Sequence, residues 1–230
     1  MTVLSFELER DELNKKLGSG FPGGSIVFIE GSNGSGKSAI AQRIAFGLLN
    51  NKTTVTLIST QLTTKGFINQ MYSINYPIVP FLLKNQLLYI PVLPLLKSQM
   101  IRSDFIERLM GAKKLFDSNV IIIDTLSSLI RASADSNKSI ELISFFKKMT
   151  GVEKTIIITV DGTELEKNIL SEFVSSSDVN ISLKQKTFGS EIKRTIMVNK
   201  FTGAKAPVGS MVGFRIEPNV GLVVEIASIA

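Results

Sequence analysis

The chain of 230 residues contains neither cysteine nor histidine, which excludes disulfides, thiolate and imidazole metal ligands, and histidine-based acid–base catalysis. Its length suits one α/β domain, so residues 1–230 are interpreted as a single domain with a substantial core. The net charge of +6 permits an acidic or nucleic-acid partner without indicating one.

Apolar strand-like segments alternate with helix-like segments through the first three quarters of the chain. Strands are expected at 25–30, 55–59, 87–92, 120–124 and 155–160. Helices are expected at 39–49, 64–72, 103–116 and 140–149. The capping-box sequence Thr163–Glu166 predicts the start of another helix, and the polar residues 132–138 predict a mobile link. Such alternation is typical of a parallel sheet that helices cover on both faces.

After about residue 178 the pattern changes to short strands without helices between them. These strands are expected at 179–183, 195–199, 211–216 and 222–226, and glycine- or proline-containing turns separate them. Consecutive strands of this kind predict antiparallel hairpins at one edge of the sheet. The expected fold class is therefore α/β, with a mainly parallel central sheet flanked by helices and C-terminal antiparallel hairpins.

Two apolar stretches, 66–83 and 85–96, are the candidates for membrane contact. The first contains several amides and two prolines, and the second is too short to cross a bilayer and contains Pro91 and Pro94. A soluble protein is expected, in which Pro91 limits its strand at the end or at an edge. The segment 76–83 fits either a docking surface or burial against the sheet.

The first expected strand runs directly into a phosphate-binding loop pattern, G-x-x-x-x-G-K-S/T. Its residues are Gly31-Ser32-Asn33-Gly34-Ser35-Gly36-Lys37-Ser38. Glycines let backbone N–H groups surround phosphate oxygens, and the start of the following helix adds a partial positive charge. Lys37 is expected to reach the β- and γ-phosphates, and the Ser38 hydroxyl to ligate Mg²⁺. The sequence therefore predicts binding of a nucleoside triphosphate with Mg²⁺, and ATP is the expected nucleotide.

The second half of such a site is expected at the ends of two other strands. Asp124 ends a wholly apolar strand, where a carboxylate holds Mg²⁺ through its water shell. Hydrolysis also needs a group that polarises water, yet Thr125 follows that aspartate and Gln61 follows the strand 55–59. Loss of a general base costs about 10²–10⁴ in rate, although a glutamine still orients water. Gln61 is interpreted as a degenerate, water-orienting catalytic residue.

Together these motifs resemble the RecA/KaiC group of P-loop ATPases, and within it the ATP-binding family of the archaellum motor. The resemblance covers essentially the whole chain. It rests on the lead-in 11–25, the stretch 60–64, the strand end 121–129 and the hairpin 194–203. It implies a RecA-like, KaiC-type fold.

Two departures from the KaiC pattern weaken the case for turnover. Gln61 and Leu62 stand where KaiC has paired catalytic glutamates, and Thr202 stands where it has a trans-acting arginine. A missing arginine finger forfeits about 10³–10⁵ in rate. Lys200 matches the KaiC lysine, so the resemblance implies a contact from Lys200 to the γ-phosphate of a neighbouring copy in a ring.

The resemblance implies a regulatory, ATP-binding protein at the cytoplasmic base of the archaellum, peripheral to the membrane. Its partners would be the motor ATPase FlaI, the membrane platform FlaJ and the scaffold FlaX. An active KaiC- or RecA-type ATPase is the alternative. A DNA-binding recombinase relative is a third reading, because basic residues gather between 184 and 205. A solvated hairpin or a subunit interface explains that charge better, since no aromatic stacking platform accompanies it.

Overall fold

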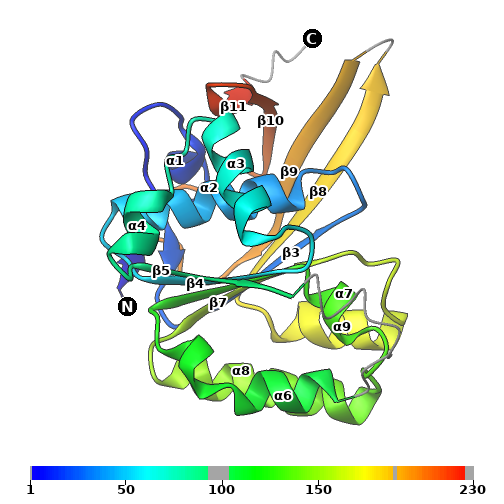
Figure 1. Ribbon diagram of the computed structural model, residues 1–230. Helices are drawn as coiled ribbons and strands as arrows, with labels where there is room; N and C mark the ends of the chain where they lie inside the picture. Colours follow the sequence, from blue (N-terminus) through cyan, green and yellow to red (C-terminus); the bar gives the residue numbers. More distant parts are fainter. Residues whose placement is uncertain (1, 93–103, 189–190, 226–230) are drawn as a thin grey trace.

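The computed structural model describes residues 2–92, 104–188 and 191–225, and a central sheet with helices on both faces dominates it (Figure 1). The strands are β1 (Val3–Leu4), β2 (Phe21–Pro22), β3 (Ile26–Gly31), β4 (Val55–Ser59), β5 (Leu87–Pro91), β6 (Val120–Asp124), β7 (Thr155–Val160), β8 (Val179–Phe188), β9 (Glu191–Phe201), β10 (Met211–Glu217) and β11 (Gly221–Glu225). The helices are α1 (Leu13–Lys16), α2 (Lys37–Asn50), α3 (Thr64–Ser73), α4 (Val79–Leu83), α6 (Phe105–Gly111), α7 (Leu126–Ile130), α8 (Ser136–Gly151) and α9 (Lys167–Ser176).

The main sheet combines a parallel centre with an antiparallel edge, as the sequence predicted. Within the described residues its order is β11-β10-β9-β8-β3-β7-β6-β4-β5. Strands β3 to β8 pair with one another in parallel, and β8, β9, β10 and β11 pair as antiparallel hairpins. The parallel register aligns Ser59 with Asp124, so the carboxyl ends of these strands meet at one edge. Strand β5 ends at Pro91 and lies at the end of the strand order, which fits the restriction that proline imposes.

The parallel strands bury both faces, which explains why they read as continuous apolar runs. Alternate residues point to opposite sides, so Val27 and Ile29 join the core beneath α2, whereas Phe28 joins the core beneath α8 and α9. Every residue of β6 and β7 is buried. These two cores hold the ends of the strands in place.

A buried ion pair fastens the N-terminal lead-in to α2. The Arg43 guanidinium donates to both carboxylate oxygens of Asp11, at 2.6 and 2.7 Å, and to the carbonyl oxygen of Phe6 at 2.8 Å. The two charged side chains are 0% and 1% exposed. Such a bidentate pair with further hydrogen bonds satisfies charges that burial would otherwise leave unpaired. This pair therefore anchors the middle of the helix that begins in the phosphate-binding loop.

The strands β8 and β9 are longer than predicted and form a ribbon that projects beyond the sheet (Figure 1). Strand β8 pairs with β3 only as far as Leu183, and β9 pairs with β10 from Arg194 to Met197. Beyond these points the two strands pair only with each other among the described residues, so the hairpin extends past the rest of the sheet. Strands β10 and β11 lie close to their predicted positions, and Ile226 lies outside the described residues.

Two predictions, one for a helix and one for a mobile link, need correction. The helix expected at 103–116 is α6, which ends at Gly111 and gives way to a 3-10 turn, Lys113–Phe116; residue 103 lies outside the described residues. Glycine is a poor helix former, and Ala112 leaves the helical region. The expected mobile link 132–138 runs into α8, because the Asp135 carboxylate accepts from the Lys138 N–H at 2.8 Å and caps the helix.

The helix start predicted from the capping-box sequence Thr163–Glu166 is also wrong. Helix α9 begins at Lys167 and has Glu166 as its N-cap residue. The Thr163 hydroxyl donates to the Asp161 carboxylate at 2.7 Å instead of capping a helix. Glu164 accepts hydrogen bonds from Ser127 and Ser128 of α7. Tertiary partners outcompete the local motif for these side chains.

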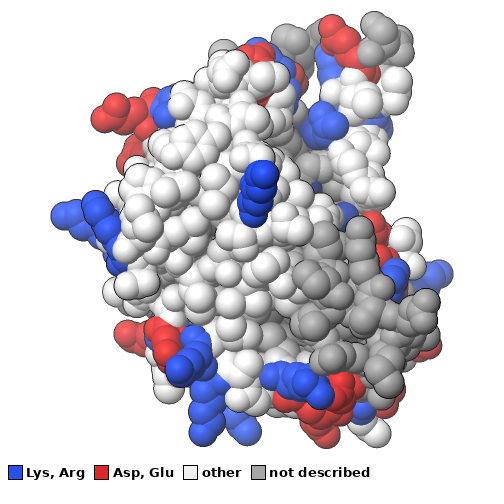
Figure 2. Space-filling view, viewed as in Figure 1, with Lys and Arg blue, Asp and Glu red and all other residues white. Residues whose placement is uncertain are grey.

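The segment 76–83 is only partly buried, and no residue of α4 is fully buried. Tyr76 and Ile78 are 1% and 0% exposed, whereas Leu83 at the end of α4 is 79% exposed. Figure 2 shows a largely uncharged face in the orientation of Figure 1, with most charged side chains toward its rim. In the described ranges, no helix combines the length and the apolar character that crossing a bilayer requires.

Candidate nucleotide-binding site

The phosphate-binding loop leaves β3 and enters α2 in a conformation that requires glycine at two points. Gly34 and Gly36 have φ values of +79° and +98°, in the left-handed region. A Cβ atom at Gly36 would lie 3.0 Å from the Phe214 ring. The Ser35 hydroxyl oxygen is buried inside the loop and has no hydrogen-bond partner among the described residues. A tight glycine cradle with a spare polar atom at a helix start fits the phosphates of a nucleotide.

The Lys37 ammonium group lies over the loop, and Lys37 is only 7% exposed. It donates to the carbonyl oxygens of Gly31 and Ser32, and it lies 3.4 Å from a carboxylate oxygen of Asp161. All three contacts hold the ammonium group beside the carboxyl end of β3. The lysine is therefore placed where the chemistry of this motif needs a cation.

Ser38, Gln61 and Asp124 come together beside the loop, although they come from three different elements. The Ser38 hydroxyl donates to the Gln61 side-chain oxygen at 3.4 Å. The Asp124 carboxylate accepts from the Thr159 hydroxyl at 2.7 Å, and Ser38 lies close enough to lower the pKa of this carboxyl. A hydroxyl and a single carboxylate beside phosphates form the oxygen-rich, incomplete shell that Mg²⁺ takes in nucleotide sites. The metal and water-orienting roles stay predictions.

Burial raises the pKa of the Asp124 carboxyl, and hydrogen bonds with Thr159 and Ser38 together with the charge of Lys37 oppose that rise only in part. Burial therefore disfavours the ionised form of the Asp124 carboxyl, and a divalent cation would stabilise that form. No cluster of three or more acidic side chains suitable for a metal ion occurs among the described residues. This donor set alone is too small for a permanent metal site, but it fits Mg²⁺ that arrives with phosphates.

A cavity of about 370 Å³ opens over the loop, and two ribbon residues contact the loop backbone. Arg194 of β9 lines this cavity and donates to the carbonyl oxygen of Gly34 at 3.1 Å, and Gln185 of β8 donates to that of Asn33 at 3.2 Å. Sequence reasoning did not assign these two residues to the site. Arg194 was noted only as the first residue of the hairpin 194–203 and as part of the basic run between 184 and 205, because nothing local indicates that the ribbon folds back over the loop.

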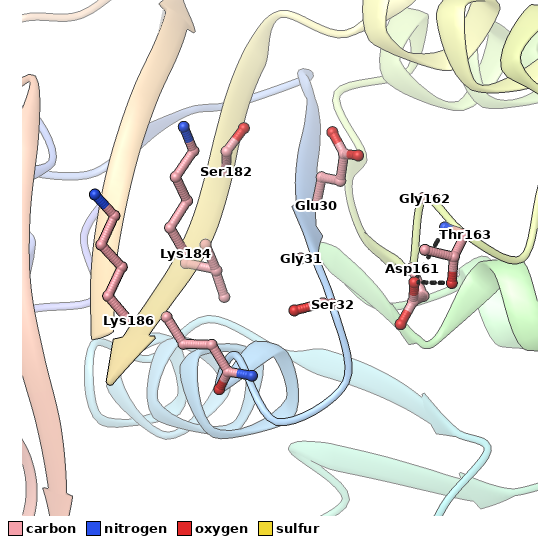
Figure 3. A pocket seen from close by; sticks show the side chains of 11 residues that line it. Glu30, Gly31, Ser32, Asp161, Gly162, Thr163, Ser182, Lys184 and Lys186 are labelled. Atoms are coloured by element: carbon pink, nitrogen blue, oxygen red, sulfur yellow. Dashed lines mark hydrogen bonds between the residues drawn. The ribbon is translucent and has the colours of Figure 1, made fainter. Parts of the chain in front are cut away.

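A second cavity of about 610 Å³ lies on the other side of the β3 end (Figure 3). Glu30 and Ser182 line it together with Lys184 and Lys186 of the ribbon, while Asp161 and Thr163 line it from the loop after β7. Gly31 and Ser32 also line this cavity, so it borders the phosphate-binding loop. The position of Asp161 after a buried apolar strand is the same signal that identified Asp124, so the sequence contained a usable clue.

Lys200 lies apart from the loop of its own chain. It pairs with Asn180 at the start of β8, and its ammonium group donates to the carbonyl oxygens of Ser175 and Ser177 at the end of α9. A cation at the carboxyl end of a helix stabilises the last carbonyl groups. A contact from Lys200 to the nucleotide of a neighbouring copy stays a prediction.

This fold and this loop define the class of protein. A P-loop follows the central strand β3, and the metal-binding candidate Asp124 ends β6, with β7 between these two strands. The molecule is a nucleotide-binding P-loop protein with a RecA-type sheet.

Comparisons with known proteins narrow the class to a family. The family model for the KaiC ATPase matches residues 11–227. The archaeal flagellar ATP-binding protein FlaH of Methanocaldococcus jannaschii is 40% identical, with 100% of this chain and 99% of the relative covered. The Methanococcus voltae protein of the same name is 36% identical over the full length of both chains. The chain belongs to the FlaH family of archaeal flagellar ATP-binding proteins, within the KaiC-type ATPases.

Solved structures agree with this assignment. The crystal structure of the flagellar accessory protein FlaH from Methanocaldococcus jannaschii superposes with a TM-score of 0.94 at 39% identity, with 98% of this chain and 100% of that chain covered. A KaiC-like protein from Pyrococcus horikoshii gives a TM-score of 0.75 at 18% identity, with 98% and 100% covered. The second likeness shows the fold alone.

Proposed function

We propose that this protein is an ATP-binding regulatory component of the archaellum motor, in which binding of ATP and Mg²⁺ controls assembly and hydrolysis is slow. Its partners would be the motor ATPase FlaI, the platform FlaJ and the scaffold FlaX, at the cytoplasmic base of the archaellum. Full-length similarity to proteins named FlaH supports the place of action. The observation that carries the regulatory role is the contact between Ser38 and Gln61.

That contact supports the proposal, because an amide lies beside the predicted Mg²⁺ ligand, and the resemblance to KaiC implies a catalytic carboxylate at this position. The predicted Mg²⁺ ligand Ser38 faces Gln61, whose side chain orients a water molecule but takes no proton from it at neutral pH. Without that base the expected loss in rate is about 10²–10⁴. The loop retains every residue of the phosphate-binding motif, so ATP binds but is hydrolysed slowly. The bound ATP itself then acts as the signal.

The roles of the chain's own residues follow from their positions. Backbone N–H groups of the loop and the start of α2 bind phosphate oxygens, and Lys37 neutralises their charge. Ser38 and Asp124 would hold Mg²⁺, which supplies charge neutralisation between the β- and γ-phosphates when it is bound. Arg194 adds a cation from the ribbon, on the solvent side of the loop. Bound Mg·ATP would therefore contact α2, the end of β6 and the ribbon at the same time.

The proposal is tested by measuring ATP binding and the affinity for purified FlaI with ATP, with ADP and without nucleotide. Lys37→Ala should reduce ATP affinity by about 100-fold or more and abolish the nucleotide effect on FlaI binding, because the loop loses its only charged phosphate ligand. Lys148→Ala, an exposed lysine on α8, is the matched control and should behave as the unmodified protein. Equal FlaI affinity in all three nucleotide conditions would overturn the proposal.

The same proposal includes a ring of copies of this chain, in which Lys200 contacts the nucleotide of a neighbouring copy. For Lys200 to reach a neighbour's γ-phosphate, it must leave the carbonyl groups at the end of α9. The alternative function, an active KaiC-type ATPase, predicts turnover well above one per minute once partners are present. Steady-state phosphate release with FlaI, FlaJ and FlaX added distinguishes the two functions, and a strong loss of rate in Gln61→Ala would favour the active enzyme.

A further inference from the structure

One carboxylate beside the phosphate-binding loop has no part in the function proposed above. Asp161 follows β7, the strand between β3 and β6, and its carboxylate lies 3.4 Å from the Lys37 ammonium group. The two side chains are 14% and 7% exposed, so solvent screens this contact only partly. The other carboxylate oxygen accepts from the Thr163 N–H at 3.1 Å and from the Thr163 hydroxyl at 2.7 Å (Figure 3).

We propose that Asp161 is a positioning residue that senses the γ-phosphate. It competes with ATP for Lys37, and its displacement is passed through the loop after β7 to helix α7. This inference rests on the proposed ATP site and names the part of the chain that responds when the site fills.

The competition follows from the number of donors on Lys37. An ammonium group has three N–H donors, and the carbonyl oxygens of Gly31 and Ser32 and the Asp161 carboxylate are the three acceptors around it. A γ-phosphate that takes one of these donors brings a second anion next to Asp161. Like charges at this distance repel strongly in a partly buried site, so the Asp161 carboxylate must move away. ADP brings less charge to this point, so it displaces Asp161 less.

The loop after β7 is built to pass such a movement to α7. The Asp161 N–H donates to the Ser127 hydroxyl at 3.0 Å. The hydroxyl groups of Ser127 and Ser128 donate to one carboxylate oxygen of Glu164, at 2.7 and 2.8 Å. Helix α7 begins two residues after Asp124, so the same helix is connected to the predicted metal ligand. One hydrogen-bonded unit therefore joins the lysine of the phosphate-binding loop to α7.

The loop also forms one wall of the 610 Å³ cavity shown in Figure 3. A Cβ atom at Gly162 would lie 2.4 Å from a carboxylate oxygen of Glu30, so the loop packs closely against the end of β3. A movement of Asp161 and Gly162 changes the shape of this cavity, because both residues line it. The surface around the cavity is where nucleotide occupancy would become visible to a partner.

A purely structural role for Asp161 makes different predictions. Asp161 and Thr163 form a local turn in which a carboxylate accepts from the N–H two residues ahead, and such turns need no ligand. If that were the whole role, a substitution would change stability and leave the preference for ATP over ADP unaltered. The ratio of the two affinities therefore separates sensing from turn formation.

The test uses the full chain and isothermal calorimetry with Mg·ATP and Mg·ADP. Asp161→Asn keeps an oxygen acceptor for Thr163 and removes the charge, so ATP affinity should rise about fivefold while ADP affinity rises less. Thr163→Val keeps the carboxylate and removes only the hydroxyl, so it is the matched control and should leave the ratio of affinities unchanged. An unaltered ratio in Asp161→Asn, or a fall in its ATP affinity, would overturn the competition.

Transmission is read by amide hydrogen exchange over residues 161–166 and 126–131 with and without Mg·ATP. In the unmodified protein, both segments should change their exchange on ATP binding. Glu164→Ala should bind ATP as the unmodified protein does, yet the response of the segment 126–131 should shrink, because the hydrogen bonds from Ser127 and Ser128 are lost and only the contact of the Asp161 N–H remains. An undiminished response of α7 in Glu164→Ala would overturn the proposed route. Failure of the unmodified protein to bind ATP would instead reject the proposed function and this inference with it.

Discussion

The parallel centre and the antiparallel edge of this sheet are held by different forces. Every residue of β6 and β7 is buried, whereas among the eleven residues of β9, all of them described, only Ile196 is buried. The central strands are fixed by apolar burial on both faces, and the ribbon is held mainly by hydrogen bonds between its two strands. Rigid strands carry the phosphate-binding loop and Asp124, and the exposed ribbon brings Arg194 to the loop. The protein thus combines a loop carried by buried strands with an exposed cover, the ribbon.

The largest expected effect comes from replacing one isoleucine in each of the two regions. Ile157→Ala in β7 removes a fully buried side chain and should lower the free energy of unfolding by about 2–5 kcal/mol. Ile192→Ala in the ribbon is the matched control, since this side chain is 53% exposed, and it should leave the midpoint of urea denaturation almost unchanged. Similar losses in both variants would show that the ribbon is part of the cooperative core.

A smaller change in stability, in the opposite direction, is expected when Asp124 at the end of β6 is substituted. Because burial raises the pKa of the Asp124 carboxyl, the folded state holds this proton more tightly than the unfolded chain. The contribution of Asp124 to stability is therefore present at acid pH and lost as the pH rises through the raised pKa. Asp124→Asn should stabilise the metal-free protein at neutral pH by about 1 kcal/mol and remove stabilisation by Mg·ATP.

Thermal unfolding at pH 4 and pH 7, with and without Mg·ATP, checks this prediction. The stabilising effect of Asp124→Asn should shrink toward acid pH, where the native carboxyl is already protonated. A destabilised Asp124→Asn at neutral pH would show that the carboxylate is needed for the fold itself.

The smallest effect concerns the cover. Arg194→Ala should weaken Mg·ATP binding about threefold without changing the unfolding midpoint, because the guanidinium lies beside the loop but at the exposed edge. Lys186→Ala on the same ribbon is the control, since Lys186 lines the second cavity and should leave ATP affinity unchanged. A loss of stability in Arg194→Ala, or equal effects of the two substitutions on binding, would contradict the separation of site and cover.

Local sequence determined the central strands, the phosphate-binding loop and the strand-end aspartate. Strands 55–59, 120–124 and 155–160 match β4, β6 and β7 residue for residue. Continuous burial leaves a strong local signal, since each such strand must be apolar on both faces. The loop is equally local, because its glycines and Lys37 act through one short turn and the start of α2.

Tertiary structure alone decided which distant side chains meet. Lys37 and Asp161 are 124 residues apart in sequence, and Arg194 lies 160 residues from Gly34. These contacts depend on the order of strands and on the reach of the ribbon, neither of which a local pattern encodes. The failed capping box shows the same limit, because the Asp161 carboxylate takes the Thr163 hydroxyl and Ser127 and Ser128 take Glu164. A side chain bonds to the partner that the fold brings within reach, and the nearest residues in sequence are only some of the candidates.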